Sequence, residues 1–101
     1  MNGDNPRRTV TVPFPEGLHL RVAAEFAKRA GRFNCDVKVW KGTEAANGKS
    51  SLELLMLGAT QGTELVLETS GPDAAAALDA LSEFLSSPLD EANDPAPPPK
   101  G

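Results

Sequence analysis

The spacing of apolar residues changes several times along this chain, and these changes restrict its fold more than any other feature. Residues 9–14 and 36–40 alternate apolar and polar side chains, as half-buried strands do, and residues 64–69 form a third strand-like segment bounded by turn residues. Residues 22–30 instead carry apolar side chains at intervals of three and four, and residues 74–85 form one apolar stripe. The pattern predicts a mixture of strands and amphipathic helices.

Turn and capping residues supply two shorter elements. A Lys-Gly pair at 41–42 predicts a turn, after which residues 43–46 predict a short, weak strand. Ser50 and Glu53 have the spacing of a capping box, in which the side chain of each residue caps the backbone amide of the other. They predict a short helix that Gly58 closes.

Glycine and proline mark the ends of the two longer helices. Gly31 is expected to end the first, and Pro72 to stand at the start of the last, where a helix needs no N–H. The predicted order is strand, helix, two strands, short helix, strand, helix. Helices on one face of a mainly antiparallel four-stranded sheet give an α+β open-faced sandwich (βαββαβα).

Length and composition exclude several classes of protein. A chain of 101 residues with 40% hydrophobic residues can bury one core but no large enclosed cavity, so we expect no cofactor. The net charge is a mild −4, of which residues 88–101 contribute −2, so the folded part is close to balanced and nucleic acid is disfavoured as a partner. Without a long apolar run we expect no membrane insertion and a cytoplasmic location. One histidine and one cysteine, Cys35, make a metal site or a stand-alone enzyme a weak hypothesis, and Cys35 is expected in or beside the core.

The composition also divides the chain. Residues 1–7 are interpreted as a flexible N-terminus and residues 8–87 as the folded domain. Residues 88–101 are acidic and then rich in proline, with too few apolar residues to fold, which predicts a disordered tail.

The only histidine, His19, stands just before the first predicted helix, with Arg21 two residues further on. An imidazole nitrogen can carry a phosphoryl group, and helix N-terminal amides with a guanidinium can hold its oxygens. The alternative is a plain surface or capping residue. Between residues 16 and 32 four basic residues accompany two acidic ones, which favours an anionic ligand or an acidic partner, although Lys28 and its basic neighbours also suit a helix C-terminus.

Three segments, residues 17–26, 47–50 and 57–65, resemble HPr, the histidine-containing phosphocarrier of the phosphoenolpyruvate-dependent sugar phosphotransferase system. That family has the same open-faced sandwich. The resemblance implies that His19 takes a phosphoryl group on Nδ1 from phosphorylated enzyme I and passes it to IIA components of sugar permeases. It also implies that Arg21 neutralises the phosphoryl oxygens during transfer, and that the protein is a carrier and not an enzyme. We expect a monomer.

The resemblance extends to a second site and a docking surface. Ser50 matches the serine that HPr kinase/phosphorylase modifies in many members, although Ser is also a common helix N-cap. The partner-binding residues implied are Leu20, Lys28, Lys49, Leu52 and Leu55, whereas Leu54 and Leu57 are better candidates for the core.

One residue departs from the family pattern. Val22 stands where the family usually has proline, so this helix start keeps an N–H and more freedom, which bears on the transfer rate. The alternative function is a regulatory HPr-like phosphoprotein that controls transcription or nitrogen and carbon metabolism with little sugar transport.

Overall fold

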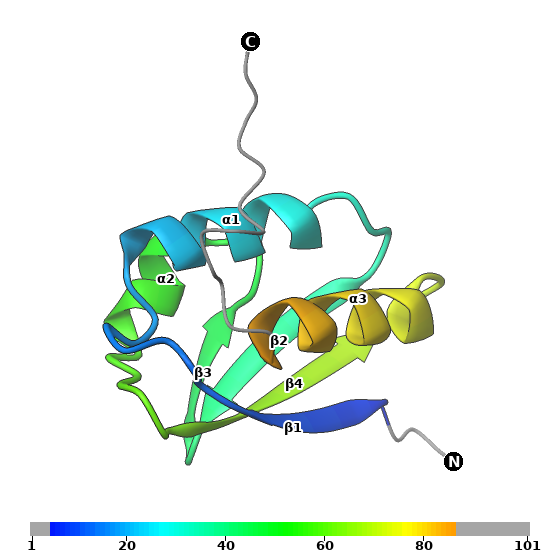
Figure 1. Ribbon diagram of the computed structural model, residues 1–101. Helices are drawn as coiled ribbons and strands as arrows, with labels where there is room; N and C mark the ends of the chain where they lie inside the picture. The colour runs from blue at the N-terminus through cyan, green and yellow to red at the C-terminus, as the bar shows by residue number, and fades with distance from the viewer. Residues whose placement is uncertain (1–4, 87–101) are drawn as a thin grey trace, which may run out of the picture.

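Four strands form one sheet, and three helices cover one of its faces (Figure 1). The computed structural model describes residues 5–86, so the predicted tail and the first four residues lie outside the described residues. The strands are β1 (Arg7–Thr11), β2 (Asp36–Lys41), β3 (Glu44–Asn47) and β4 (Glu64–Ser70), and the helices are α1 (Leu20–Ala30), α2 (Ser51–Met56) and α3 (Ala74–Ser86). The predicted element order and the α+β open-faced sandwich are confirmed.

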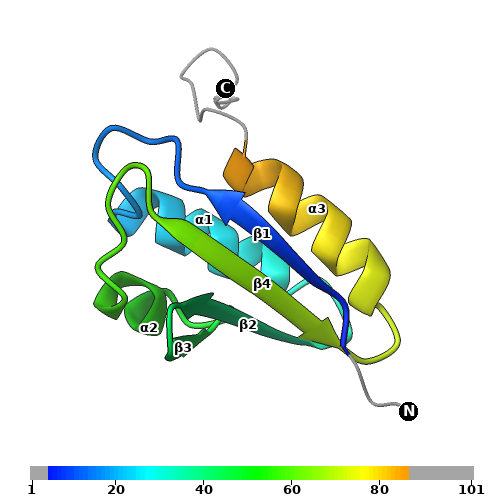
Figure 2. The ribbon, with the colours of Figure 1, turned by 90° about the horizontal axis from the view of Figure 1, so that it is seen from below.

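The sheet has the order β1-β4-β2-β3, and every neighbouring pair is antiparallel. The view from below shows the face that no helix covers, with the helices behind it (Figure 2). Along β4, Leu65, Leu67 and Thr69 are buried and alternate with more exposed residues, because successive side chains on a strand point to opposite faces. The core therefore lies on the helical side, where α1 buries Val22, Ala23, Phe26 and Ala30, and α3 buries Leu78, Leu81 and Leu85.

Several element boundaries differ from the sequence-based expectation, and β1 begins at Arg7, within the residues 1–7 interpreted as a flexible N-terminus. β1 ends at Thr11 instead of continuing to residue 14, because its partner β4 begins at Glu64, opposite Thr11, and the chain before β4 turns at residues 61–62. α3 begins at Ala74, so the expectation that Pro72 opens its first turn was wrong. Asp73 is the residue immediately before α3. Its carboxylate accepts a 2.7 Å hydrogen bond from the backbone N–H of Asn34.

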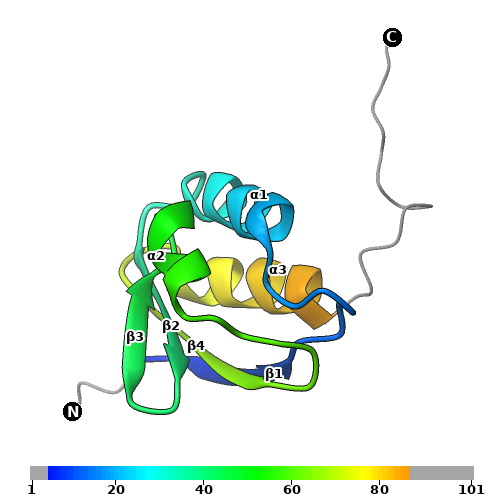
Figure 3. The same ribbon diagram turned by 90° about the vertical axis from the view of Figure 1, so that its left-hand side faces the viewer.

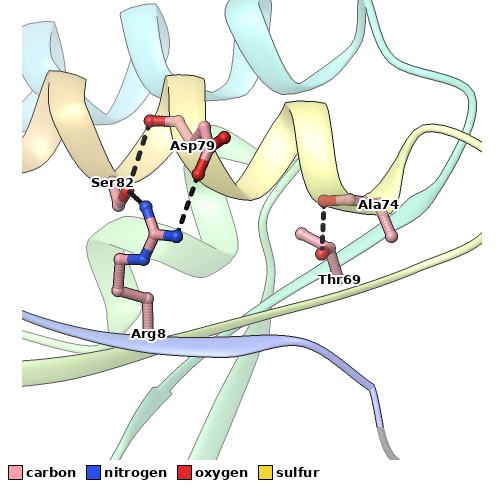
Figure 4. A network of polar contacts seen from close by, with 5 residues as sticks. All are labelled: Arg8, Thr69, Ala74, Asp79 and Ser82. Carbon is pink, nitrogen blue, oxygen red and sulfur yellow. Dashed lines mark hydrogen bonds and ion pairs between the residues drawn. The ribbon is translucent and has the colours of Figure 1, made fainter.

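Side-chain contacts join α3 to the sheet at two points (Figure 4). From β1, the Arg8 guanidinium donates a 2.8 Å hydrogen bond to Ser82 Oγ and lies 2.9 Å from an Asp79 carboxylate oxygen. From β4, the buried Thr69 hydroxyl donates to the Ala74 carbonyl at 2.8 Å. These contacts fix α3 over the β1–β4 side of the sheet.

On the uncovered face, Glu68 is the centre of a polar network. Its carboxylate accepts 2.8 Å hydrogen bonds from Asn5 Nδ2 and Trp40 Nε1, and Arg7 lies 3.4 Å away. These hydrogen bonds, with Arg7 and Lys38 as nearby cations, lower the pKa of Glu68 below its ordinary value of 4.5.

A carboxyl group with a lowered pKa makes stability depend on pH. The ionised Glu68 stabilises the folded state above the pKa of the unfolded chain, and this contribution is lost as the pH falls through the lower, folded-state pKa. We expect the free energy of unfolding to fall more steeply between about pH 5 and pH 3 for the wild type than for Glu68→Gln. Urea unfolding at several pH values measures this, with Glu44→Gln as a control of equal charge change at an exposed site. Parallel curves for wild type and Glu68→Gln would contradict the assignment.

Candidate functional site

His19 is the residue at which α1 begins. Its backbone is extended, with φ −88° and ψ 178°, and it occupies the N-cap position without making a side-chain capping hydrogen bond. The first helical bond runs from the Ala23 N–H to the His19 carbonyl, at 2.9 Å. The helix therefore starts two residues before the expected position 22, and the amides of residues 20–22 precede its first internal bond. The imidazole is half-buried, with 33% of its side chain exposed.

A tight turn at Gly17 sets the position of His19. The Gly17 N–H donates to Phe14 O at 2.8 Å, the Leu18 N–H to Ala59 O, and the His19 N–H to Gly17 O, both at 2.9 Å. Gly17 has a φ of +74°, and a Cβ there would collide with the carbonyl of Ala59. Gly17 and Leu18 are buried, so the chain reaches His19 along a path that only glycine permits.

Two charged residues accompany His19. Arg21 is exposed and lies in the first turn of α1, because this helix begins at Leu20. Glu16 was expected only as one of two acidic residues in this part of the chain. In the structure, one of its carboxylate oxygens lies 4.0 Å from His19 Nε2. Its spacing of three residues from the histidine, across a glycine turn, was the signal that could have identified it.

Val22 is fully buried in the first turn of α1. Its methyl groups are therefore part of the core. The residue that departs from the family pattern contributes packing to the helix that begins at His19, in addition to an N–H ahead of the first helical bond.

Three large apolar side chains are exposed near this end of the molecule. Leu20 is 63% exposed, Leu52 66% and Met56 74%. They lie on α1 and α2, which pack against each other and are seen side by side in Figures 1 and 3. Met56 was missed, although its i, i+4 spacing from Leu52 places both on one helix face.

The other leucines of this region lie deeper. Leu55, expected in the docking surface, is half-buried and packs against the core. Leu54 and Leu57 are buried, as expected. α2 therefore presents Leu52 and Met56 to solvent, buries Leu54 and leaves Leu55 half-buried.

Ser50 is the N-cap of α2. Its Oγ accepts a 3.2 Å hydrogen bond from the Glu53 N–H, which confirms half of the expected capping box. The reciprocal half was wrong, because the Glu53 carboxylate accepts from the Asn47 N–H at 2.8 Å and the Ser50 N–H donates to Asn47 O at 3.0 Å. In the tight turn from Asn47 to Ser50, the Asn47 carbonyl takes the place that the capping box gives to the Glu53 carboxylate.

The two lysines assigned to partner binding lie in different places. Lys49 is exposed next to Ser50, and its Nζ donates to Phe33 O at 3.0 Å. Lys28 is exposed on α1, eight residues beyond Leu20, which is about 12 Å along the helix axis. The structure therefore does not bring Lys28 next to His19.

Other kinds of site find little support within residues 5–86. No group of three or more His, Cys, Asp or Glu side chains there is arranged to hold a metal ion. Cys35 is buried, and burial raises the pKa of its thiol, which disfavours the reactive thiolate. Over the same residues, no helix combines the length and apolar character needed to cross a membrane.

Comparison with known proteins gives a consistent result. Residues 6–87 match the family model described as "PTS HPr component phosphorylation site". The chain is 40% identical over 87 residues to phosphocarrier protein HPr of Pseudomonas putida. The match covers 85% of this chain and 97% of that protein. It is 37% identical over 86 residues to phosphocarrier protein NPr of Shewanella violacea, covering 85% of this chain and 94% of that protein.

Solved structures agree with these relatives. The crystal structure of HPr from Bacillus anthracis superposes with a TM-score of 0.78 and 32% identity, covering 83% of this chain and 99% of that one. The crystal structure of Crh, a catabolite repression protein of Bacillus subtilis described as a swapped dimer, gives a TM-score of 0.66 and 37% identity, covering 70% of this chain and 82% of that one.

The turn at Gly17 generates a stability prediction. Gly17→Ala places a Cβ against the Ala59 carbonyl and forces alanine into a left-handed conformation. Gly42 has a similar φ, +62°, with nothing within 4 Å of its Cβ position, so Gly42→Ala isolates the conformational cost, which is about 1–2 kcal/mol. We expect Gly17→Ala to be less stable than Gly42→Ala by a further ~1–3 kcal/mol in urea unfolding. Equal destabilisation of the two variants would show that the turn is not tightly packed.

Proposed function

This chain belongs to the HPr family of phosphocarrier proteins of the phosphotransferase system, and we propose that His19 accepts a phosphoryl group from phosphorylated enzyme I and passes it to IIA components of sugar permeases. The observation that carries the proposal is the position of His19, a half-buried N-cap residue whose side chain makes no capping hydrogen bond. Its imidazole is available for chemistry, because it has no such structural task.

The start of α1 suits the product of this transfer. Amides ahead of the first helical bond point out of the helix, and the helix dipole favours negative charge there. A phosphoryl group on His19 would meet the amides of residues 20–22. The site lies on the surface and is not an enclosed cavity, which suits a carrier that releases its cargo to a second protein.

Arg21 supplies a second source of stabilisation. Arg21 is exposed in the first turn of α1, the same turn that would carry the phosphoryl group. A guanidinium near transferring oxygens neutralises charge that develops in the transition state. Arg21 therefore acts on the rate of transfer, whereas His19 provides the covalent bond.

The exposed apolar residues Leu20, Leu52 and Met56 form the docking surface in this proposal. Exposed side chains of this size are candidates for contact with partner proteins. Leu55 supports the surface from beneath. Lys49 and Lys28 contribute positive charge further away, which suits acidic partners.

Ser50 is the proposed regulatory site, modified by HPr kinase/phosphorylase. Its Oγ already lies at the N-terminus of α2, where a phosphate is electrostatically favourable, so the modification leaves the fold intact. It adds negative charge two residues from Leu52, on the docking surface, and so opposes the approach of an acidic partner.

The second candidate is a regulatory phosphoprotein that controls transcription or nitrogen and carbon metabolism. Likeness to a protein named NPr and to the catabolite repression protein Crh favours it. The two functions differ in whether the phosphorylated protein passes its phosphoryl group to IIA components of sugar permeases. Transfer to such a component supports the carrier function, and absence of transfer to every such component supports the regulatory function. For both candidate functions we place the protein in the cytoplasm. We also propose that it is a monomer, and light scattering would distinguish a monomer from a swapped dimer by its molar mass.

Substitutions at His19 and Arg21 test the carrier directly. His19→Ala should abolish acid-labile labelling from phosphoenolpyruvate and enzyme I while the urea midpoint stays close to that of the wild type. Arg21→Ala should still be labelled, but about one to two decades more slowly, because transfer then proceeds without one charge-assisted hydrogen bond to the phosphoryl oxygens. Arg32→Ala, beyond the other end of α1, is the matched control. Labelling of His19→Ala at the wild-type rate would exclude His19 as the acceptor.

A charged substitution tests the regulatory site. Ser50→Asp should slow labelling by enzyme I several-fold at low salt and less at high salt, because salt screens repulsion between exposed charges. Thr43→Asp makes the same charge change in the exposed turn between β2 and β3 and should react like the wild type. Equal rates for Ser50→Asp and wild type at low salt would contradict the proposed coupling.

A further inference from the structure

We propose that Glu16 is a positioning residue that keeps the proton of His19 on Nε2 and so leaves Nδ1 as the nucleophile. This inference rests on the proposed function of His19 as phosphoryl acceptor and assigns a task to a neighbouring side chain. Its basis is the 4.0 Å distance between a Glu16 carboxylate oxygen and His19 Nε2.

The backbone between the two residues is held in place. Gly17 and Leu18, which separate them, are buried and hydrogen-bonded to Phe14 and Ala59. The relative position of the Glu16 and His19 backbones is therefore fixed. The Glu16 side chain is 80% exposed, so it has room to move the roughly 1 Å that separates the present contact from a hydrogen bond.

A carboxylate at one ring nitrogen selects the tautomer of a neutral imidazole. It accepts a hydrogen bond only from a protonated nitrogen, so it favours the form with the proton on Nε2 and the lone pair on Nδ1. The first turn of α1 contains no acidic residue that could compete for the ring. The nearby charged side chain in that turn is Arg21, a cation, which cannot accept this proton.

The same contact serves both directions of transfer. On loading, the Nδ1 lone pair forms the N–P bond while the phosphorus–nitrogen bond of a phosphohistidine donor breaks and its electron pair returns to the donor ring. The proton stays on Nε2, so the phosphorylated ring carries a positive charge that faces the Glu16 carboxylate. On unloading, the N–P electron pair returns to Nδ1, and neutral imidazole leaves instead of the much poorer imidazolate.

The position of the carboxylate limits its repulsion of the phosphoryl group. The two nitrogens lie on opposite sides of a ring carbon, so a group on Nδ1 extends away from a partner at Nε2. Aspartate would be too short to make the same contact without moving the backbone, whereas glutamine keeps the shape and removes the charge. Glu16→Gln is therefore the informative substitution.

The test compares Glu16→Gln with Glu44→Gln, which makes the same charge change on β3. Nitrogen-15 NMR of the imidazole reports the tautomer ratio without any phosphorylation, and rapid-quench labelling by enzyme I reports the transfer rate. We expect the wild type and Glu44→Gln to favour the Nε2–H form and to be labelled on Nδ1. In Glu16→Gln the tautomer ratio and the transfer rate should each fall by about two- to fivefold, the range for an exposed charged pair.

The outcomes separate this inference from the function on which it rests. Labelling of wild-type His19 with tautomer ratios and rates unchanged in Glu16→Gln would overturn the role of Glu16 and leave the carrier function standing. Labelling on Nε2 would overturn it as well. Absence of any label on wild-type His19 would overturn the carrier function itself, and with it the inference.

Discussion

The hydrogen bond from the Leu18 N–H to the Ala59 carbonyl joins the segment before α1 to the segment before β4, and the geometry of the site depends on it. It requires a close approach of two backbones, which the absence of a side chain at Gly17 permits. The adjoining turn then delivers His19 to the N-cap position of α1 with its backbone extended. The histidine is placed by main-chain contacts, and its imidazole is left available for chemistry.

The scaffold and the site occupy different parts of the molecule. Arg8 and Thr69 join α3 to β1 and β4, and Glu68 collects hydrogen bonds on the uncovered face of the sheet. The start of α1 and the exposed side of α2 carry the histidine and the exposed apolar residues. None of these scaffold contacts involves His19 or the first turn of α1.

The element order and the fold class could be predicted from the sequence, because the spacing of apolar residues and the positions of turn residues are local signals. The sequence placed His19 at a helix start and Ser50 at an N-cap for the same reason. It could not predict how far each helix residue near the site is exposed, because the packing of α1 on α2 decides that. Leu55 is half-buried against the core, and the exposed Met56 was missed. The contact between Glu16 and His19 depends on how the chain turns at Gly17, which is set by a residue more than forty positions further along, Ala59.

In the proposed function, the N-terminal turn of α1 receives the phosphoryl group on His19. Amide chemical shifts of the uniformly nitrogen-15-labelled protein, before and after phosphorylation by phosphoenolpyruvate and enzyme I, test it most directly. We expect the largest changes at the amides of residues 19–23, with β1, β4 and α3 nearly unaffected. Changes concentrated in α2 or in the sheet, with the first turn of α1 unmoved, would contradict it.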